Sequence, residues 1–183
     1  MKKMKKTKKV LVVVDYQNDF VTGCLGFEKA VALEKPILDK IRQYKENNDE
    51  VVFTFDTHYD NYLETQEGKN LPVPHCLKDS PGWKLYGKVA ELCEENDKCF
   101  HKETFGSIEL VSYLSENKYD SVELIGLVSN ICVLSNAILA KAALPEAEII
   151  VDASCTASFD EALHQKALDV MEGMHIKIIN DIL

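Results

Sequence analysis

Apolar and β-branched residues of this chain gather in short continuous runs that are separated by longer amphipathic stretches. Such runs, without polar alternation, are typical of strands buried on both faces of a sheet. The runs predict strands at residues 10–14, 51–55, 121–127, 147–151 and 175–179, with a weaker one at 98–101.

Between these runs, apolar residues recur at helical spacing. They predict helices at residues 36–47, 84–95, 108–116 and 130–143. A further helix is expected to open at a capping box of Ser158 and Glu161 and to close at Gly173. Strands that alternate with helices of this length predict a Rossmann-like, three-layer α/β/α fold around a central, mainly parallel sheet.

The length of 183 residues suits a single domain, which we place at residues 10–183. Residues 1–9 form a basic stretch that we expect to be a disordered tail. Residues 56–82 show no clear periodicity and contain several prolines. Loops of this length inside compact domains usually carry function, so we expect part of a binding site there.

Charge and composition narrow the classes of partner. The net charge is −9, and without the six lysines of the first nine residues the remainder has 15 basic against 30 acidic groups. Such a body repels phosphate backbones, which argues against nucleic-acid binding. We see neither a secretory signal nor a membrane span, and we read the six cysteines as free thiols. These features predict a cytoplasmic protein.

Four chemically active residues follow predicted strands, namely Asp15, Asp56, Lys102 and Cys132. The carboxyl ends of parallel strands meet at one edge of the sheet, where ligands bind. A carboxylate, a lysine and a cysteine at that edge would supply the base, the electrostatic support and the nucleophile of a covalent mechanism. Taken singly, each has a plainer explanation, such as a turn aspartate, a surface lysine or a packed thiol.

Cys132 falls in the first turn of the helix predicted at 130–143, after the possible N-caps Ser129 and Asn130. Unpaired amides and the helix dipole favour a thiolate there, and a nearby cation such as Lys102 would favour it further. We therefore expect an activated thiol.

Three segments together resemble the signatures of the isochorismatase-like cysteine hydrolases, in particular the nicotinamidase and pyrazinamidase branch. They are the stretch 15–20 after the first strand, Lys102, and the stretch 126–133 around Cys132. The resemblance covers nearly the whole chain from Val10 onward. It implies that Asp15, Lys102 and Cys132 form a catalytic triad. It also implies a cis peptide between Val128 and Ser129, with backbone amides of Ser129 and Cys132 forming an oxyanion hole.

The same branch resembles this chain in a metal-binding segment within residues 56–82. The resemblance implies that Asp56, His58, Glu64 and His75 hold a divalent metal, and this donor chemistry suits Zn, Fe or Mn. Phe20, Phe105 and Leu71 are implied to contact the substrate ring. The chain departs from many nicotinamidases around residues 71–72 and 105–107, so its ring pocket differs from theirs.

By resemblance, the expected activity is hydrolysis of nicotinamide to nicotinate and ammonia through a thioester, in a homo-oligomer. The alternatives are an isochorismatase-like hydrolase for another small amide or a vinyl ether, and a non-catalytic binding module. The three triad residues argue against the binding module, because a binding role does not require them at those positions.

Overall fold

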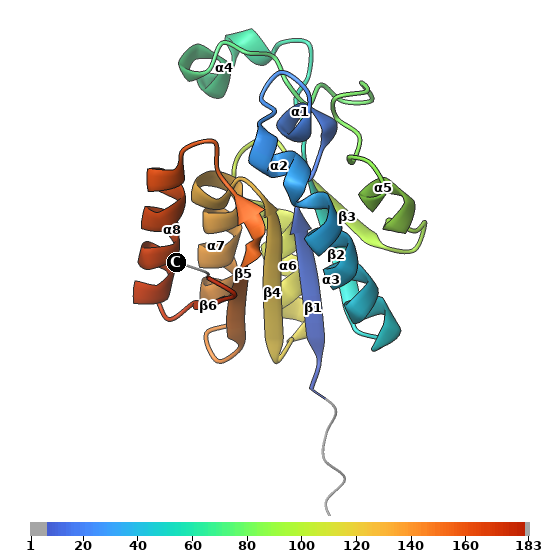
Figure 1. Cartoon of the computed structure of the whole chain (residues 1–183), viewed down its shortest axis with the longest axis vertical. Helices are drawn as coiled ribbons and strands as arrows, with labels where there is room; N and C mark the ends of the chain where they lie inside the picture. The colour runs from blue at the N-terminus through green and yellow to red at the C-terminus, as the bar shows by residue number, and fades with distance from the viewer. Residues whose placement is uncertain (1–6, 182–183) are drawn as a thin grey trace, which may run out of the picture.

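In the computed structural model, which describes residues 7–181, six strands form one parallel sheet with the order β3-β2-β1-β4-β5-β6 (Figure 1). The strands are β1 (Lys9–Val14), β2 (Glu50–Asp56), β3 (Lys98–Lys102), β4 (Ser121–Leu127), β5 (Glu148–Ala157) and β6 (Lys177–Ile179). The expectation of a central parallel sheet is confirmed. The tail expected at residues 1–9 lies mostly outside the described residues, and Lys9 already belongs to β1.

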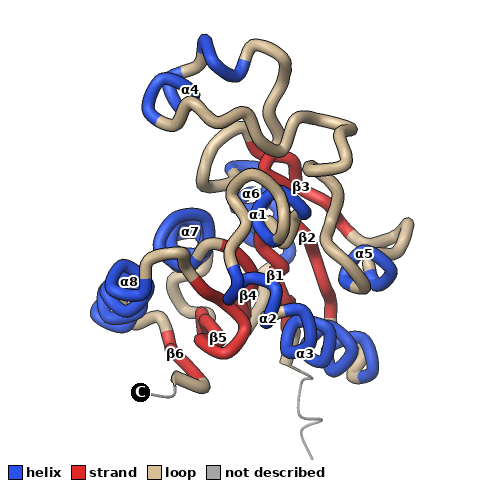
Figure 2. Tube along the Cα trace, turned by 45° about the horizontal axis from the view of Figure 1, so that its top comes forward, coloured by secondary structure: helices blue, strands red, loops and turns tan. Residues whose placement is uncertain are grey.

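Helices cover both faces of the sheet (Figure 2). The side chains of β1 point alternately into the two cores that these helices form with the sheet. Leu11 and Val13 are fully buried in a core that includes Ile37 of α3. Val12 is fully buried in the opposite core, together with Leu114 of α6. Complete burial of such a side chain contributes about 1.5–3 kcal/mol. The helices are α1 (Asn18–Val21), α2 (Glu28–Ala32), α3 (Glu34–Glu46), η1 (Tyr62–Glu64), α4 (Gln66–Asn70), α5 (Val89–Leu92), α6 (Ile108–Asn117), η2 (Ser129–Val133), α7 (Leu134–Ala143) and α8 (Glu161–Gly173).

The helix predicted at residues 84–95 is wrong, because only Val89–Leu92 is helical. The preceding backbone pairs with the segment after β1 instead. Leu85 forms an antiparallel bridge with Gln17, and the amide of Tyr86 donates to the carbonyl of Tyr16 over 2.9 Å. These hydrogen bonds use groups that a longer helix would need.

Two element ends also differ from the sequence prediction. The last helix is capped by Asp160, whose carboxylate accepts the amide of Leu163 over 3.0 Å, and the side chain of Ser158 accepts the amide of Asp160 instead. The last strand begins at Lys177 rather than at His175, because His175 has a φ of 61° and belongs to the turn after α8.

The site lies where the strand order reverses, between β1 and β4, which is where open parallel sheets bind ligands. Gly126 of β4 has a φ of 108°, and a Cβ there would come within 2.1 Å of the carbonyl oxygen of Val14. Only glycine allows this approach of β4 to β1. Among the described residues, no helix combines the length and the apolar character that a membrane crossing requires.

Candidate active site

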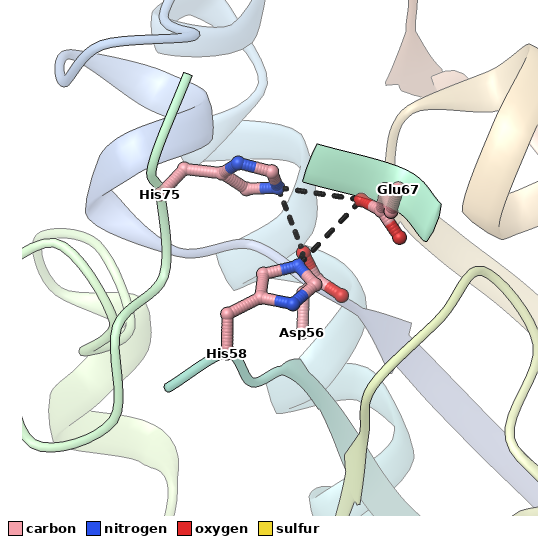
Figure 3. A group of neighbouring side chains, drawn as sticks. All are labelled: Asp56, His58, Glu67 and His75. Atoms are coloured by element: carbon pink, nitrogen blue, oxygen red, sulfur yellow. Dashed lines mark hydrogen bonds and ion pairs between the residues drawn. The ribbon is translucent and has the colours of Figure 1, made fainter. Parts of the chain in front are cut away.

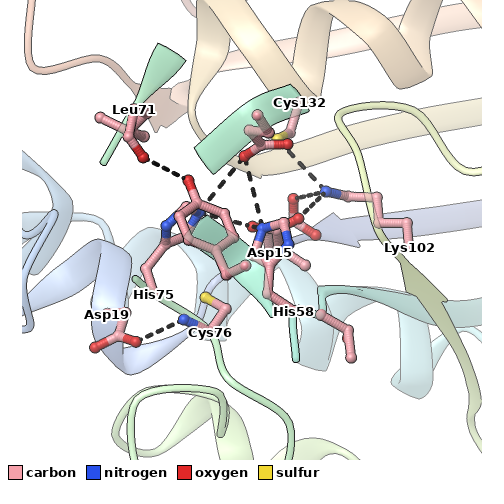
Figure 4. A network of polar contacts seen from close by, with 12 residues as sticks. Asp15, Asp19, His58, Leu71, His75, Cys76, Lys102 and Cys132 are labelled. Carbon is pink, nitrogen blue, oxygen red and sulfur yellow. Dashed lines mark hydrogen bonds and ion pairs between the residues drawn. The ribbon is translucent and has the colours of Figure 1, made fainter. Parts of the chain in front are cut away.

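Lys102 is the centre of a buried polar cluster at the carboxyl end of the sheet (Figure 4). Its Nζ lies 2.6 Å from Oδ2 of Asp15, 3.2 Å from Oδ1 of Asp56 and 3.5 Å from Sγ of Cys132. We call these four residues the Lys102 cluster. The strand ends therefore bring together the four side chains that the sequence predicted to meet. Burial alone would lower the pKa of Lys102, but the surrounding negative groups, Asp15 foremost, raise it well above its ordinary value.

Asp15 is held in a fixed orientation directly after β1. Its φ is 44°, its side chain is completely buried, and Oδ1 accepts the hydroxyl of Thr54 over 2.6 Å. The other carboxylate oxygen faces Lys102. Burial raises the pKa of Asp15 in spite of the opposing charge of Lys102. A carboxylate with a raised pKa is suited to accept and return a proton during a reaction.

Cys132 lies in η2, a π-helical turn that leads from β4 into α7. The side chain is buried, and burial raises the pKa of its thiol well above the ordinary value, with Lys102 acting in the opposite direction. The helix turn and Lys102 were expected to favour a thiolate, and burial opposes them. Desolvation of the sulfur outweighs the nearby cation, so attack by Cys132 requires a base.

The cis peptide joins Leu127 to Val128, one residue earlier than the predicted bond between Val128 and Ser129. Leu127 is the last residue of β4 that pairs with β5, and Val128 already acts as the extended cap of η2. The carbonyl of Val128 accepts the amides of Ile131 and Val133 over 3.1 and 3.2 Å. The cis peptide therefore lies where the pairing of β4 with β5 ends.

Two residues that the sequence analysis missed hold the turn around Cys132. Nδ2 of Asn136 donates to the carbonyl of Cys132 over 2.8 Å and to the carbonyl of Phe105 over 3.1 Å. Nδ1 of His164, from α8, lies 2.8 Å from the hydroxyl of Ser129. Both are helical polar residues with no distinctive spacing, so the sequence carries no signal for these contacts.

A second group adjoins the Lys102 cluster and consists of two carboxylates and two imidazoles (Figure 3). The ligand atoms of Asp56, His58, Glu67 and His75 all lie within 4.8 Å of one another. Oδ2 of Asp56 is 3.1 Å from Nε2 of His58 and 3.2 Å from Nε2 of His75. Asp56 therefore belongs to both groups, with one oxygen toward Lys102 and the other toward the imidazoles. Although burial opposes it, Lys102 and the histidines hold the pKa of Asp56 well below its ordinary value.

The prediction of Glu64 as the fourth ligand is wrong, because the group contains Glu67 in its place. It ends η1 and is exposed, whereas Glu67 one helical turn later approaches both imidazoles at 3.6 and 3.8 Å. The physical reason is local. Thr65 caps α4 by accepting the amide of Gly68 over 3.0 Å, which places Glu67 in the first turn of that helix.

The donor set fits a divalent metal. Nδ1 of His75 faces the carbonyl of Val73 at 2.8 Å, which leaves Nε2 as the ligand atom, and such outer contacts orient metal-binding histidines. Zn bonds of about 2.0–2.1 Å place tetrahedral ligand atoms about 3.3 Å apart, close to the spacings in this group. Asp19 fixes the loop, because its carboxylate accepts the amide of Cys76 over 2.7 Å.

Both groups border one largely apolar cavity of about 500 Å³. The three residues expected to contact a substrate ring, Phe20, Phe105 and Leu71, all line it together with Cys132. Phe159, from the loop after β5, also lines this cavity and was not predicted. The rest of the wall consists of Leu25, Asp56, Gln66, Glu67, Asn70, His75, Val128 and Ile131. The arrangement can hold a flat apolar molecule with its reactive group at the sulfur.

Comparison with known proteins adds family information to this geometry. The isochorismatase domain model matches residues 9–180. An uncharacterized isochorismatase family protein PncA of Bacillus subtilis is 30% identical over 172 residues, covering 88% of this chain and 92% of the relative. The crystal structure of the nicotinamidase PncA from Bacillus subtilis has a TM-score of 0.84 at 28% identity, covering 94% of this chain and 99% of that one. A Pyrococcus horikoshii pyrazinamidase in complex with zinc shares the fold, with a TM-score of 0.82 at 24% identity and coverage of 94% and 98%.

Proposed function

Because the chain belongs to the isochorismatase family, we propose that it is a cysteine-dependent amidohydrolase that converts nicotinamide to nicotinate and ammonia. One observation carries the proposal: Nζ of Lys102 lies within 3.5 Å of Asp15, Asp56 and Cys132, beside an apolar cavity. The name of the similar Bacillus subtilis structure, a nicotinamidase, supports the choice of amide.

In the first half of the reaction, Asp15 accepts the thiol proton while Sγ of Cys132 attacks the carboxamide carbon. The raised pKa values of Asp15 and Cys132 match this transfer, since a full charge on either side chain is unfavourable in a buried site. Lys102 keeps a positive charge beside the pair. We assign the oxyanion to backbone amides of Ser129 and Cys132, and one such donor is typically worth about 2.7–4 kcal/mol.

In the second half, Asp15 returns its proton to the amide nitrogen and ammonia leaves, so that a thioester of Cys132 remains. Asp15 then takes a proton from a water molecule that attacks the thioester carbon. The bond to sulfur breaks, nicotinate is released, and the thiol regains a proton. General acid and base catalysis of this kind contributes about 10²–10⁴-fold to the rate.

A divalent metal held by Asp56, His58, Glu67 and His75 would supply a Lewis acid that binds the pyridine nitrogen. The apolar wall orients the ring, with Phe20, Phe105 and Leu71 as contacts. The donor atoms favour Zn, Fe or Mn over Mg or Ca, which prefer oxygen ligands alone.

The test measures ammonia release from nicotinamide, pyrazinamide and benzamide, of which benzamide lacks a ring nitrogen. We expect the wild-type protein to prefer the two amides with a ring nitrogen. Cys132→Ala should lower the rate by at least about 10⁴-fold, as removal of a nucleophile does in other covalent hydrolases. Cys155→Ala is the matched control, since Cys155 is a buried thiol of β5 and should keep normal activity. Undiminished ammonia release by Cys132→Ala would refute the mechanism.

We further propose that the protein acts in the cytoplasm as a homo-oligomer. The acidic composition supports a soluble setting, and light scattering of the purified chain would give the oligomeric state. If the protein is a monomer that hydrolyses nicotinamide, the proposed homo-oligomer is wrong and the proposed activity stands.

A further inference from the structure

A pair of thiols lies on the surface, apart from the Lys102 cluster. Cys93 directly follows α5, and Cys99 is the second residue of β3. Their Sγ atoms are 3.7 Å apart. Cys99 is exposed and Cys93 is half-buried, so a small solute reaches the pair from solvent.

The turn between the two cysteines holds them together. The amide of Glu94 donates to the carboxylate of Asp97 over 2.9 Å, and the amide of Asp97 donates to the carbonyl of Glu94 over 3.0 Å. Nζ of Lys45, from α3, lies 2.8 Å from the same carboxylate. The turn is therefore anchored to the body of the protein.

The two thiols differ in acidity. Their mutual hydrogen bond lowers the pKa of Cys99 and raises that of Cys93. Cys99 is thus the better nucleophile of the pair, and Cys93 lies beside it. An accessible cysteine of lowered pKa next to a second cysteine is the arrangement of peroxide-sensitive dithiols.

From the 3.7 Å contact, the anchored turn and the exposure of Cys99, we infer that Cys93 and Cys99 form an oxidative modification site that hydroperoxides convert to a disulfide. With hydrogen peroxide, Cys99 gives its proton to water, its thiolate attacks one peroxide oxygen, the O–O bond breaks, and the hydroxide that leaves takes up a proton. The sulfur of Cys93 then attacks the resulting sulfenic acid, the S–O bond breaks, and water leaves with the proton of Cys93. Two electrons pass from the thiols to the peroxide, which ends as water.

The other thiols differ from this pair in access or in neighbours. Cys132, Cys76 and Cys155 are buried. Cys24 is exposed, and its thiol donates to the carbonyl of Pro74 over 3.6 Å. Cys24 is therefore a matched control for an accessible thiol in another setting.

The sequence allows a direct test, because trypsin cleaves after Lys88, Lys98 and Lys102 and so separates the two cysteines. The full-length protein is treated with hydrogen peroxide, remaining thiols are alkylated, and the digest is analysed by mass spectrometry. We expect peptides 89–98 and 99–102 to appear joined with loss of two hydrogen atoms, and to separate after reduction. A mixture of ¹⁴N and ¹⁵N protein should give joined peptides of a single isotope, as a link within one chain requires.

Three variants complete the experiment. Cys93→Ser should abolish the joined peptide and leave a sulfenic acid on Cys99 that dimedone traps. Cys99→Ser should abolish both, while Cys24→Ser should leave the joined peptide unchanged. The inference is overturned if peroxide leaves peptides 89–98 and 99–102 separate, or joins them only between isotopes. None of these results depends on amidase activity, so the inference and the proposed function can fail independently.

Discussion

Lys102, which is buried, and Lys40, which is largely buried, each bind two carboxylates, yet of these two only Lys102 faces a nucleophile. Lys102 does so at the carboxyl ends of β1 and β2, where it also meets Cys132. Lys40, from α3, does so over the middle of the sheet, 2.7 Å from Glu123 and 2.8 Å from Asp152. We call the second group the Lys40 cluster, which comprises Lys40, Tyr44, Glu123 and Asp152.

The two clusters differ in what surrounds the lysine and its two carboxylates. In the Lys40 cluster both are occupied by protein donors: the hydroxyl of Tyr44 donates to Glu123 over 2.7 Å, and Ser154 and Asn180 donate to Asp152 over 2.7 and 3.0 Å. The pKa of Asp152 falls and that of Lys40 rises, although burial opposes both changes.

In the Lys102 cluster, by contrast, the third contact of the lysine is a thiol that lines a cavity. A lysine that lies between two carboxylates and has a raised pKa is therefore not by itself evidence of catalysis, because both Lys40 and Lys102 have these properties. What separates them is the position at the strand ends and the presence of a reactive group at the cavity. The Lys40 cluster joins α3 to β4 and β5, which indicates a structural role.

Of the changes that test this comparison, replacing Lys102 should have the largest effect, a loss of activity. Lys102→Met keeps the length of the side chain but removes the charge beside Asp15 and Cys132. We expect kcat/KM for nicotinamide to fall by about 10²–10³-fold, the effect of removing one electrostatic contact to the reacting atoms. Ammonia release is the measurement, and circular dichroism checks that the variant is folded. Wild-type rates in a folded Lys102→Met protein would show that the two lysines play equivalent roles.

The next largest effect concerns the group of Asp56, His58, Glu67 and His75, because the Lys40 cluster has no such neighbouring group. Glu67→Gln removes one of the four charged or imidazole donors and should weaken zinc binding by at least about 10-fold, since even outer contacts of a metal site cost 10–100-fold. Competition with a chromogenic chelator gives the affinity. Glu64→Gln is the matched control, because Glu64 is exposed on η1 and should leave the affinity unchanged. The reverse order of the two variants would restore Glu64 as the ligand.

The groups of the Lys102 cluster were predictable because parallel strands end at one edge, so that Asp15, Asp56 and Lys102 were placed by position alone. Glu67 was missed because Glu64 lies only three residues before it, and spacing alone does not choose between the two. The available signal was Thr65, which caps α4 and so places Glu67 in the first turn of that helix. The raised pKa of the Cys132 thiol was not predictable, since burial of a side chain depends on the whole fold.

The Lys40 cluster escaped the sequence analysis because its residues meet across two layers. One signal existed: Glu123 stands inside the apolar run of β4, and a charged residue in a buried strand requires a partner. The identity of that partner was hidden, because the orientation of α3 over the sheet decides it. Similarly, the contact of Cys93 with Cys99 depends on a turn that no short sequence motif predicts.

A smaller effect, on stability alone, is expected for Lys40→Met. Two carboxylates lose an amino group, and a buried polar group without its partner costs about 1–3 kcal/mol. The lower part of that range applies because 15% of the Lys40 side chain is exposed, so water can reach the vacated space. Urea denaturation measures the free energy of unfolding, and kcat for nicotinamide should stay at the wild-type value.

The control for this change is Lys35→Met on the same helix. The side chain of Lys35 is 85% exposed and pairs with Asp39, and exposed pairs contribute little to stability. If Lys40→Met lowered the activity of a folded protein as strongly as Lys102→Met does, the division into a structural and a catalytic cluster would be wrong.

The smallest effect is a change in how stability depends on pH. Although burial opposes it, Lys40, Ser154 and Asn180 hold the pKa of Asp152 below its ordinary value of 3.8. Asp152 therefore stabilises the folded state at a pH above 3.8, and this contribution is lost as the pH falls through its lower value in the folded protein. In Asp152→Asn, the free energy of unfolding should fall less steeply on acidification than in the wild type.

Asp39→Asn is the matched control, because Lys35 also lowers the pKa of Asp39, but at the exposed surface. Salt screens exposed pairs far more than buried ones. The effect of Asp39→Asn on the acid slope should therefore vanish in 1 M salt, at a Debye length of about 3 Å, whereas that of Asp152→Asn should persist. Equal loss of both effects in salt would mean that water reaches the Lys40 cluster freely, and Asp152 would then owe its lowered pKa to surface pairing rather than to the buried network.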